Sequence, residues 1–128
     1  MKIAIPLFGN RISPRFDFSP EMWMITVENN RVARQEKLPM ANLNLPQRLA
    51  HLTSNGVNRV ICGGIDEFCL GHLSDKEVAV FHNVVGEAEI AFHLFMEGKL
   101  RSGCRCERRG KHPCGLKNGP PWKEEVHD

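Results

Sequence analysis

The feature that most constrains the fold is the alternation of short apolar runs with helix-patterned segments in the second half of the chain. Two apolar runs of strand length are each followed by a predicted helix: 58–65 before 66–76, which opens with two acidic residues as a helix start prefers, and 77–83 before 86–100, which has helical spacing. Strand–helix–strand order predicts parallel strands joined by crossovers. Another helix is predicted at 45–56, where leucines recur at helical spacing between Pro46 and Gly56.

The first 39 residues are patterned differently. Segment 2–8 is an apolar run followed by turn-forming residues, and segments 21–30 and 31–39 read as two strands joined at Asn29-Asn30. This hairpin must be antiparallel. The expected fold class is therefore α/β, with a mixed sheet of about five strands, an N-terminal antiparallel hairpin and later parallel crossovers.

Composition restricts the function classes. With 128 residues the chain suits one compact domain, and it has no run of about 18 apolar residues that could span a bilayer. We expect a cytoplasmic protein without a membrane partner. The net charge of +2 makes no case for nucleic acid, although the basic excess lies in residues 101–128, with seven Lys and Arg against four Asp and Glu.

A binding site is expected where the predicted parallel strands end, because ligands of open α/β sheets collect at the carboxyl edge. Polar residues and glycines from three segments would meet there: Arg11, Ser13, Arg15, Gly63, Gly64 and His82. Basic side chains facing backbone N–H groups at a helix start would form an anion cradle. Gly63 and Gly64 could equally serve only close packing, and the two readings carry equal weight.

Catalysis finds little support in the sequence. It contains no G-x-S-x-G, H-E-x-x-H or Walker A motif, and the first predicted strand has no acidic residue to hold a metal ion. The protein is predicted to bind a ligand without being an enzyme, and a degenerate hydrolase is the weaker alternative. Cys62 and Cys69 are expected to be small core hydrophobes, and His51, His72 and His93 surface or boundary residues.

Three stretches resemble the dinitrogenase iron–molybdenum cofactor biosynthesis family, which includes NifX-like proteins, the C-terminal domain of NifB-like proteins and the molybdenum–copper orange protein. They are MKIAIPLFGNRISPRFDFSP (1–20), VNRVICGGI (57–65) and VVGEAEIAFHLFMEGKL (84–100). The resemblance implies a ribonuclease H-like domain that carries an anionic metal–sulfur cluster of iron–molybdenum type among cofactor-assembly proteins and MinD/Mrp-type ATPases. Relatives commonly have histidine where this chain has Arg15, whose guanidinium can hold an anion but cannot ligate a metal.

The resemblance covers residues 1–100, which are predicted to form the carrier domain, and leaves 101–128 as a Cys/His-containing basic tail. Five cysteines is an odd number, so a disulfide framework is not expected. The tail combines three cysteines with one histidine in a stretch that offers little apolar surface to bury them: Cys104, Cys106, His112 and Cys114. This set suits zinc, and its thiolates equally suit Cu(I) or an iron–sulfur cluster. The alternative is a basic tail with exposed thiols.

These observations predict a small carrier of an anionic metal–sulfur cofactor, accessory to metallocluster assembly, with a further zinc or iron site in the tail. An alternative is a redox- or metal-sensing regulator, in which the tail thiols control a partner ATPase.

Overall fold

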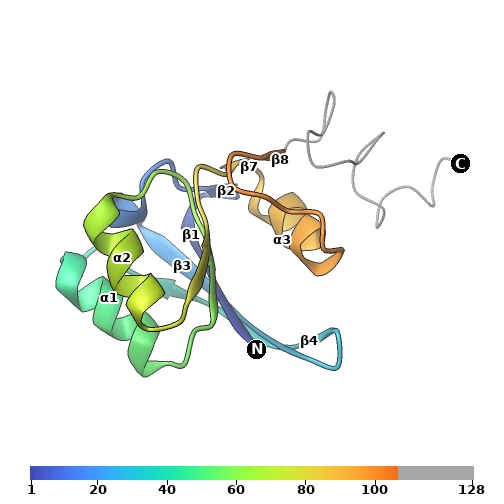
Figure 1. Cartoon of the computed structure of the whole chain (residues 1–128), viewed down its shortest axis with the longest axis horizontal. Helices are drawn as coiled ribbons and strands as arrows, with labels where there is room; N and C mark the ends of the chain where they lie inside the picture. Colours follow the sequence, from blue (N-terminus) through green and yellow to red (C-terminus); the bar gives the residue numbers. More distant parts are fainter. Residues whose placement is uncertain (107–128) are drawn as a thin grey trace, which may run out of the picture.

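The computed structural model describes residues 1–106, which form a mixed sheet with helices on both faces (Figure 1). The strands are β1 (Lys2–Phe8), β2 (Arg11–Ile12), β3 (Glu21–Glu28), β4 (Arg31–Pro39), β5 (Arg59–Ile61) and β6 (Ala79–Phe81). Their order across the sheet is β4-β3-β1-β5-β6, with β2 beside β1. β1 pairs antiparallel with β3 and parallel with β5, and β5 pairs parallel with β6. The predicted hairpin and crossovers are confirmed.

Three helices cover the sheet. α1 (Leu45–Ser54) and α2 (Glu67–Asp75) lie on one face and α3 (Ala88–Met96) on the other (Figure 1). The side chains of β1 alternate between two cores, because Ile3, Ile5 and Leu7 pack in the α3 layer and Ala4 packs in the α1/α2 layer. A single 3₁₀ turn, η1 (Phe16–Phe18), separates β2 from β3.

Local sequence signals explain where the elements begin and end. Asn29 and Asn30 have φ angles of 55° and 62°, the left-handed conformation that a tight hairpin turn requires. Asn44 begins α1 through a capping box with Gln47. The carboxylate of Asp66 accepts the backbone N–H of Cys69 and caps α2. The three predicted helices are confirmed, each shorter than its sequence pattern by a few residues.

The packed structure continues for six residues beyond Leu100. β8 (Arg105–Cys106) pairs in parallel with β7 (Val85–Gly86), a strand that leads into α3. Gly86 has a φ of 126°, and the main chain of Cys106 fills the space where a β-carbon of Gly86 would be. Cys104 and Cys106 are 2% and 0% exposed, so these cysteine side chains do enter a core, contrary to the sequence expectation.

Among residues 1–106, no helix combines the length and the apolar character that crossing a membrane would require.

Candidate functional site

Except for Arg11, the predicted cradle residues lie on loops that meet at the carboxyl edge of the sheet, where backbone hydrogen bonds join these loops. The N–H of Gly64 donates to the carbonyl of Pro14 (2.7 Å), and the N–H of Phe16 donates back to the carbonyl of Gly64 (2.8 Å). On its other side, the carbonyl of Gly63 accepts the N–H of Asn83 (2.8 Å). Segments 13–16, 63–64 and 82–84 therefore lie side by side as a backbone ladder.

The ladder continues into the segment that carries the tail cysteines. The backbone N–H of His82 donates to the hydroxyl of Ser102 (3.0 Å), and the N–H of Gly103 donates to the carbonyl of His82 (2.9 Å). One step further, the N–H of Val85 donates to the carbonyl of Cys104 (2.9 Å). The structure thus brings the first two tail cysteines to the same edge as the predicted cradle, a proximity that the sequence did not predict.

Packing requires glycine at position 63, and a backbone hydrogen bond occupies the amide at position 64. Gly63 lies directly against the main chain of Ser13 and Pro14, where a side chain would collide. The N–H of Gly64 is already donated to Pro14, so it is not directed at a ligand. Ser13 is buried, and its hydroxyl donates to the carbonyl of Arg15 (3.0 Å), which shapes the loop. The side chains, rather than the Gly64 amide, would have to recognise a ligand.

Arg15 borders a cavity of about 260 Å³ beside the start of α2, which it shares with Asp17, Asp66 and Cys69. Its guanidinium donates to both carboxylate oxygens of Asp17 (3.0 Å each) and lies over the ring of Phe18. This hydrogen bond from Arg15 lowers the pKa of Asp17, and the backbone hydrogen bond from Cys69 lowers the pKa of Asp66. The wall of the cavity therefore carries one cation and two carboxylates. It is less positively charged than the predicted anion cradle.

Arg11 belongs to a different part of the edge. It lies in β2 and forms a backbone bridge with Glu87, which precedes α3. The N–H of Glu87 donates to the carbonyl of Cys106 (2.7 Å). Arg11 and Arg15 are thus attached to opposite ends of the edge, and Arg11 does not line the cavity that Arg15 borders.

Cys62 and Cys69 are buried in the α1/α2 layer, as predicted. Burial is the main cause that raises the pKa of each thiol to about 12, and the neighbouring Asp66 carboxylate adds to the effect at Cys69. Both remain protonated at neutral pH. A metal ion would have to displace these protons before either sulfur could bind it.

The sulfur atoms of Cys104 and Cys106 lie 3.6 Å apart. Two thiolates on one tetrahedral zinc ion, each about 2.3 Å from the metal, stand about 3.8 Å apart, so this spacing fits a shared ion. Cys104 is disulfide-bonded in this structure, which the sequence did not predict, and its use as a ligand would require reduction. Residues 1–106 contain no group of three metal-binding side chains, and the predicted ligands His112 and Cys114 lie outside that range.

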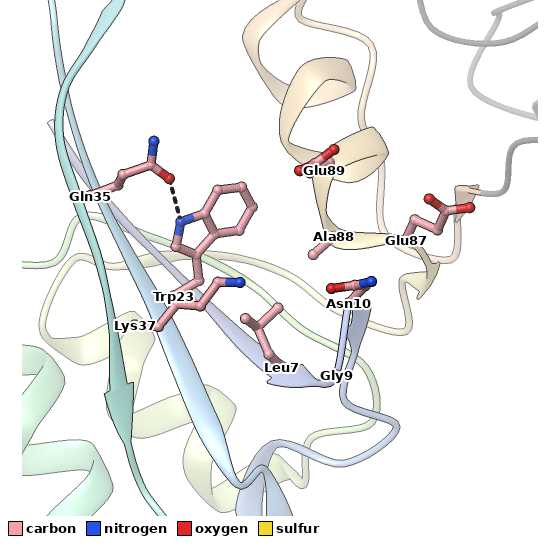
Figure 2. A pocket seen from close by; sticks show the side chains of 9 residues that line it. All are labelled: Leu7, Gly9, Asn10, Trp23, Gln35, Lys37, Glu87, Ala88 and Glu89. Carbon is pink, nitrogen blue, oxygen red and sulfur yellow. Dashed lines mark hydrogen bonds between the residues drawn. The ribbon is translucent and has the colours of Figure 1, made fainter.

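A second cavity, of about 240 Å³, opens between the sheet and the start of α3 (Figure 2). Trp23 of β3 forms one wall, and its indole N–H donates to the side-chain oxygen of Gln35 on β4 (2.9 Å). Lys37 lies beside it, and Glu89 of α3 stands across the opening. None of these residues stood out as a candidate site residue in the sequence. The available signal was a tryptophan within an alternating strand, on a face that α3 covers incompletely.

Comparison with known proteins supports the fold. No family model matches the sequence. An uncharacterized protein of Methanocaldococcus jannaschii, MJ0580, is 28% identical over 105 residues, which cover 78% of this chain and 89% of the relative. The crystal structure of PH0822 matches with a TM-score of 0.73 at 20% identity, covering 80% of this chain and 94% of that one. This chain therefore has the same fold as PH0822.

Two further structures have the same fold and descriptive names. A "putative dinitrogenase" of Methanocaldococcus jannaschii matches with a TM-score of 0.66 at 23% identity, covering 78% of this chain and 91% of that one. A "putative NifB protein" from Thermotoga matches with a TM-score of 0.63 at 22% identity, covering 79% and 91%.

Proposed function

We propose that this chain is a small, non-enzymatic binding protein that carries an anionic metal–sulfur cofactor or cluster precursor of iron–molybdenum type. Membership of the dinitrogenase cofactor biosynthesis family, the ribonuclease H-like assignment and a cytoplasmic location belong to the same proposal. The shared fold with proteins named for dinitrogenase and NifB supports it, together with the three sequence stretches that resemble the family. The partners would be cofactor-assembly proteins and MinD/Mrp-type ATPases.

The observation that carries the proposal is that the segments bearing Arg15, His82 and Cys104 follow one another along one backbone ladder at the carboxyl edge. The side chain of Arg15 is 64% exposed, so a ligand can reach it without rearrangement of the core. A multiply charged anion would compete with the single carboxylate of Asp17 for the guanidinium. Thiolates at Cys104 and Cys106 would supply the soft ligands that an iron or molybdenum centre prefers.

Tetrathiomolybdate, a small anionic molybdenum–sulfur species, is a suitable probe for this carrier role. Reduced protein would be titrated with it without oxygen, binding would be followed by visible absorption, and metal would be counted after gel filtration. We expect the Arg15→Ala variant to bind about tenfold more weakly and the Cys104→Ser/Cys106→Ser variant to lose the retained metal. Arg59→Ala, on the amino-terminal side of β5, is the matched control. Failure of the wild type to bind, or equal binding by all variants, would contradict the proposal.

A regulator that acts through the tail thiols is the second candidate function. It is favoured by the disulfide at Cys104 together with the Cys106 sulfur 3.6 Å away, because a thiolate at that distance could exchange with a disulfide. The test compares binding of a MinD/Mrp-type ATPase by the reduced and the oxidised protein. Redox-dependent binding without tetrathiomolybdate binding would select the regulator.

A further inference from the structure

β4 is the outermost strand on its side of the sheet. It runs for nine residues, Arg31–Pro39, and pairs with β3 along one edge. Within residues 1–106 no strand pairs with its other edge. All nine residues are exposed except the half-buried Leu38. An uncovered edge of this length offers backbone donors and acceptors to another strand.

The charges on β4 complement those on β4 of a second copy, which is therefore the strand best suited to pair with this edge. Arg34 and Glu36 are two residues apart, so an antiparallel pairing with Gln35 opposite the partner's Gln35 sets each of them opposite its counterion. The two-fold axis repeats the contact, which gives two Arg–Glu pairs. A register centred on Arg34 or on Glu36 would instead set like charges opposite each other.

The register of β4 on β3 places these charges on one face. Arg34 lies opposite Thr26 and Glu36 opposite Met24, which packs in the α1/α2 layer. Gln35 and Lys37 project to the other face, beside the Trp23 cavity (Figure 2). Both salt bridges would therefore form on the α1/α2 face, and the paired strands would border the Trp23 cavity on the α3 face.

A register shift between β3 and β4 limits how many residues of β4 could pair with a second copy. The register between β3 and β4 shifts at Thr26/Val27, opposite Arg34 and Val32, so the regular part of β4 begins near Arg34. A bulge and exposed charges are common protections against edge pairing, and here the charges disfavour the registers centred on Arg34 and on Glu36. Pairing in the register centred on Gln35 would span residues 33–37 of each copy, so it reaches the bulged Ala33 only at its end.

We propose that this protein forms a reversible two-fold dimer by antiparallel pairing of β4 with β4 of a second copy, centred on Gln35. The short contact predicts weak, concentration-dependent association. This inference does not depend on the proposed carrier function, because Arg15 and the cysteine pair lie at the carboxyl edge and not on β4.

The charge arrangement allows a reciprocal test by sedimentation equilibrium over a range from low to several hundred micromolar, with reduced full-length protein. Arg34→Glu and Glu36→Arg should each weaken dimerisation about tenfold or more, since each sets like charges opposite each other twice. The double variant Arg34→Glu/Glu36→Arg restores the opposite charges and should dimerise like the wild type. High salt should reduce these differences.

Cross-linking tests the register independently. In the Gln35→Cys variant, mild oxidation should link position 35 of one copy to position 35 of the other, as identified by mass spectrometry. Lys37→Cys is the matched control, because position 37 would face Ala33 of the partner and not itself. A wild type that stays monomeric throughout the concentration range overturns the proposal. So does a dimer that neither single charge reversal weakens.

Discussion

Gly63 faces the carbonyl oxygen of Ser13 so closely that a β-carbon on Gly63 would lie 2.5 Å from it. The same β-carbon would lie 2.7 Å from the carbonyl oxygen of Pro14. Both atoms belong to the backbone of the loop that carries Arg15, so they cannot move aside as a flexible side chain could. The glycine is required for the contact between β5 and this loop.

Gly63→Ala should therefore destabilise the protein by about 1–3 kcal/mol, measured by urea unfolding, because the loop must shift to admit the methyl group. Gly71→Ala is the matched control, since nothing lies within 4 Å of its β-carbon position and it sits inside α2. That substitution should stabilise the protein by up to about 1 kcal/mol through helix propensity. Equal effects of the two substitutions would contradict the packing argument.

Arg48 is a buried cation that ties three segments together. Its guanidinium donates to the carbonyls of Ser19, Met40 and Leu43, and also to the hydroxyl of Ser19. Arg48→Met should reduce the free energy of unfolding by about 2–4 kcal/mol, because buried carbonyls lose their donors. Arg59→Met, which removes a single hydrogen bond to Asn58, should change it by less than about 1 kcal/mol.

The thiols of Cys62 and Cys69 should react slowly with iodoacetamide in the native protein at pH 8. Their pKa values of about 12 leave very little thiolate, and both side chains are buried. Mass spectrometry after timed alkylation would measure the rates, with urea-unfolded protein as the control. Rapid native labelling of either residue would show that this part of the core opens readily.

Stability should begin to fall when the pH drops below the ordinary histidine pKa of 6.5, because burial lowers the pKa of His93 in the folded protein. The unfolded chain then binds a proton that the folded chain resists, so acidification favours unfolding. Glu89 and Glu97 oppose the shift without reversing it. Thermal unfolding of His93→Gln between pH 7 and pH 5 should show a smaller decline than the wild type, and an equal decline would contradict this assignment.

The lowered pKa values of Asp17 and Asp66 make the stability of the folded protein depend on pH in a more acidic range. Each carboxylate stabilises the folded protein above its ordinary pKa of 3.8, and this contribution is lost as the pH falls through the lowered value. The decline below about pH 4 should therefore persist in His93→Gln.

A chain cut after Leu100 should be markedly less stable than one cut after Cys106. The shorter chain loses the carbonyl partners of the Val85 and Glu87 amides, together with two buried cysteine side chains. The expected difference in unfolding free energy is about 3 kcal/mol or more. Comparable melting temperatures for the two chains would show that residues 101–106 contribute little to folding.

The sequence predicted the long elements because their periodicity extends over many residues. The apolar alternation of 21–30 and the leucine spacing of 45–56 each repeat often enough to identify a strand and a helix. β2, β7 and β8 have two residues each, too few for any period to appear. Tertiary contacts define them, and composition alone gives no signal for such contacts.

The sequence predicted which loops meet at the sheet edge better than it predicted the contacts that they make. Topology brought the loops of Ser13, Gly63 and His82 to one edge, as parallel strands require. The sequence did not reveal that Asp17 would engage Arg15 or that Pro14 would accept the Gly64 amide, since both depend on the loop's conformation. Burial of Cys104 and Cys106 was missed because β7 and α3, and not the local sequence, provide the surrounding surface.

Gly86 has a consequence for comparing sequences across relatives. The space beside it is filled by the main chain of Cys106, twenty residues later, so a side chain at position 86 would exclude the returning segment. A relative that keeps glycine at the position of Gly86 can accommodate a returning segment beside β7. A relative with a larger residue there must direct the equivalent segment elsewhere. The absence of a side chain at position 86 is therefore a condition for the cysteine-bearing segment to fold against the domain.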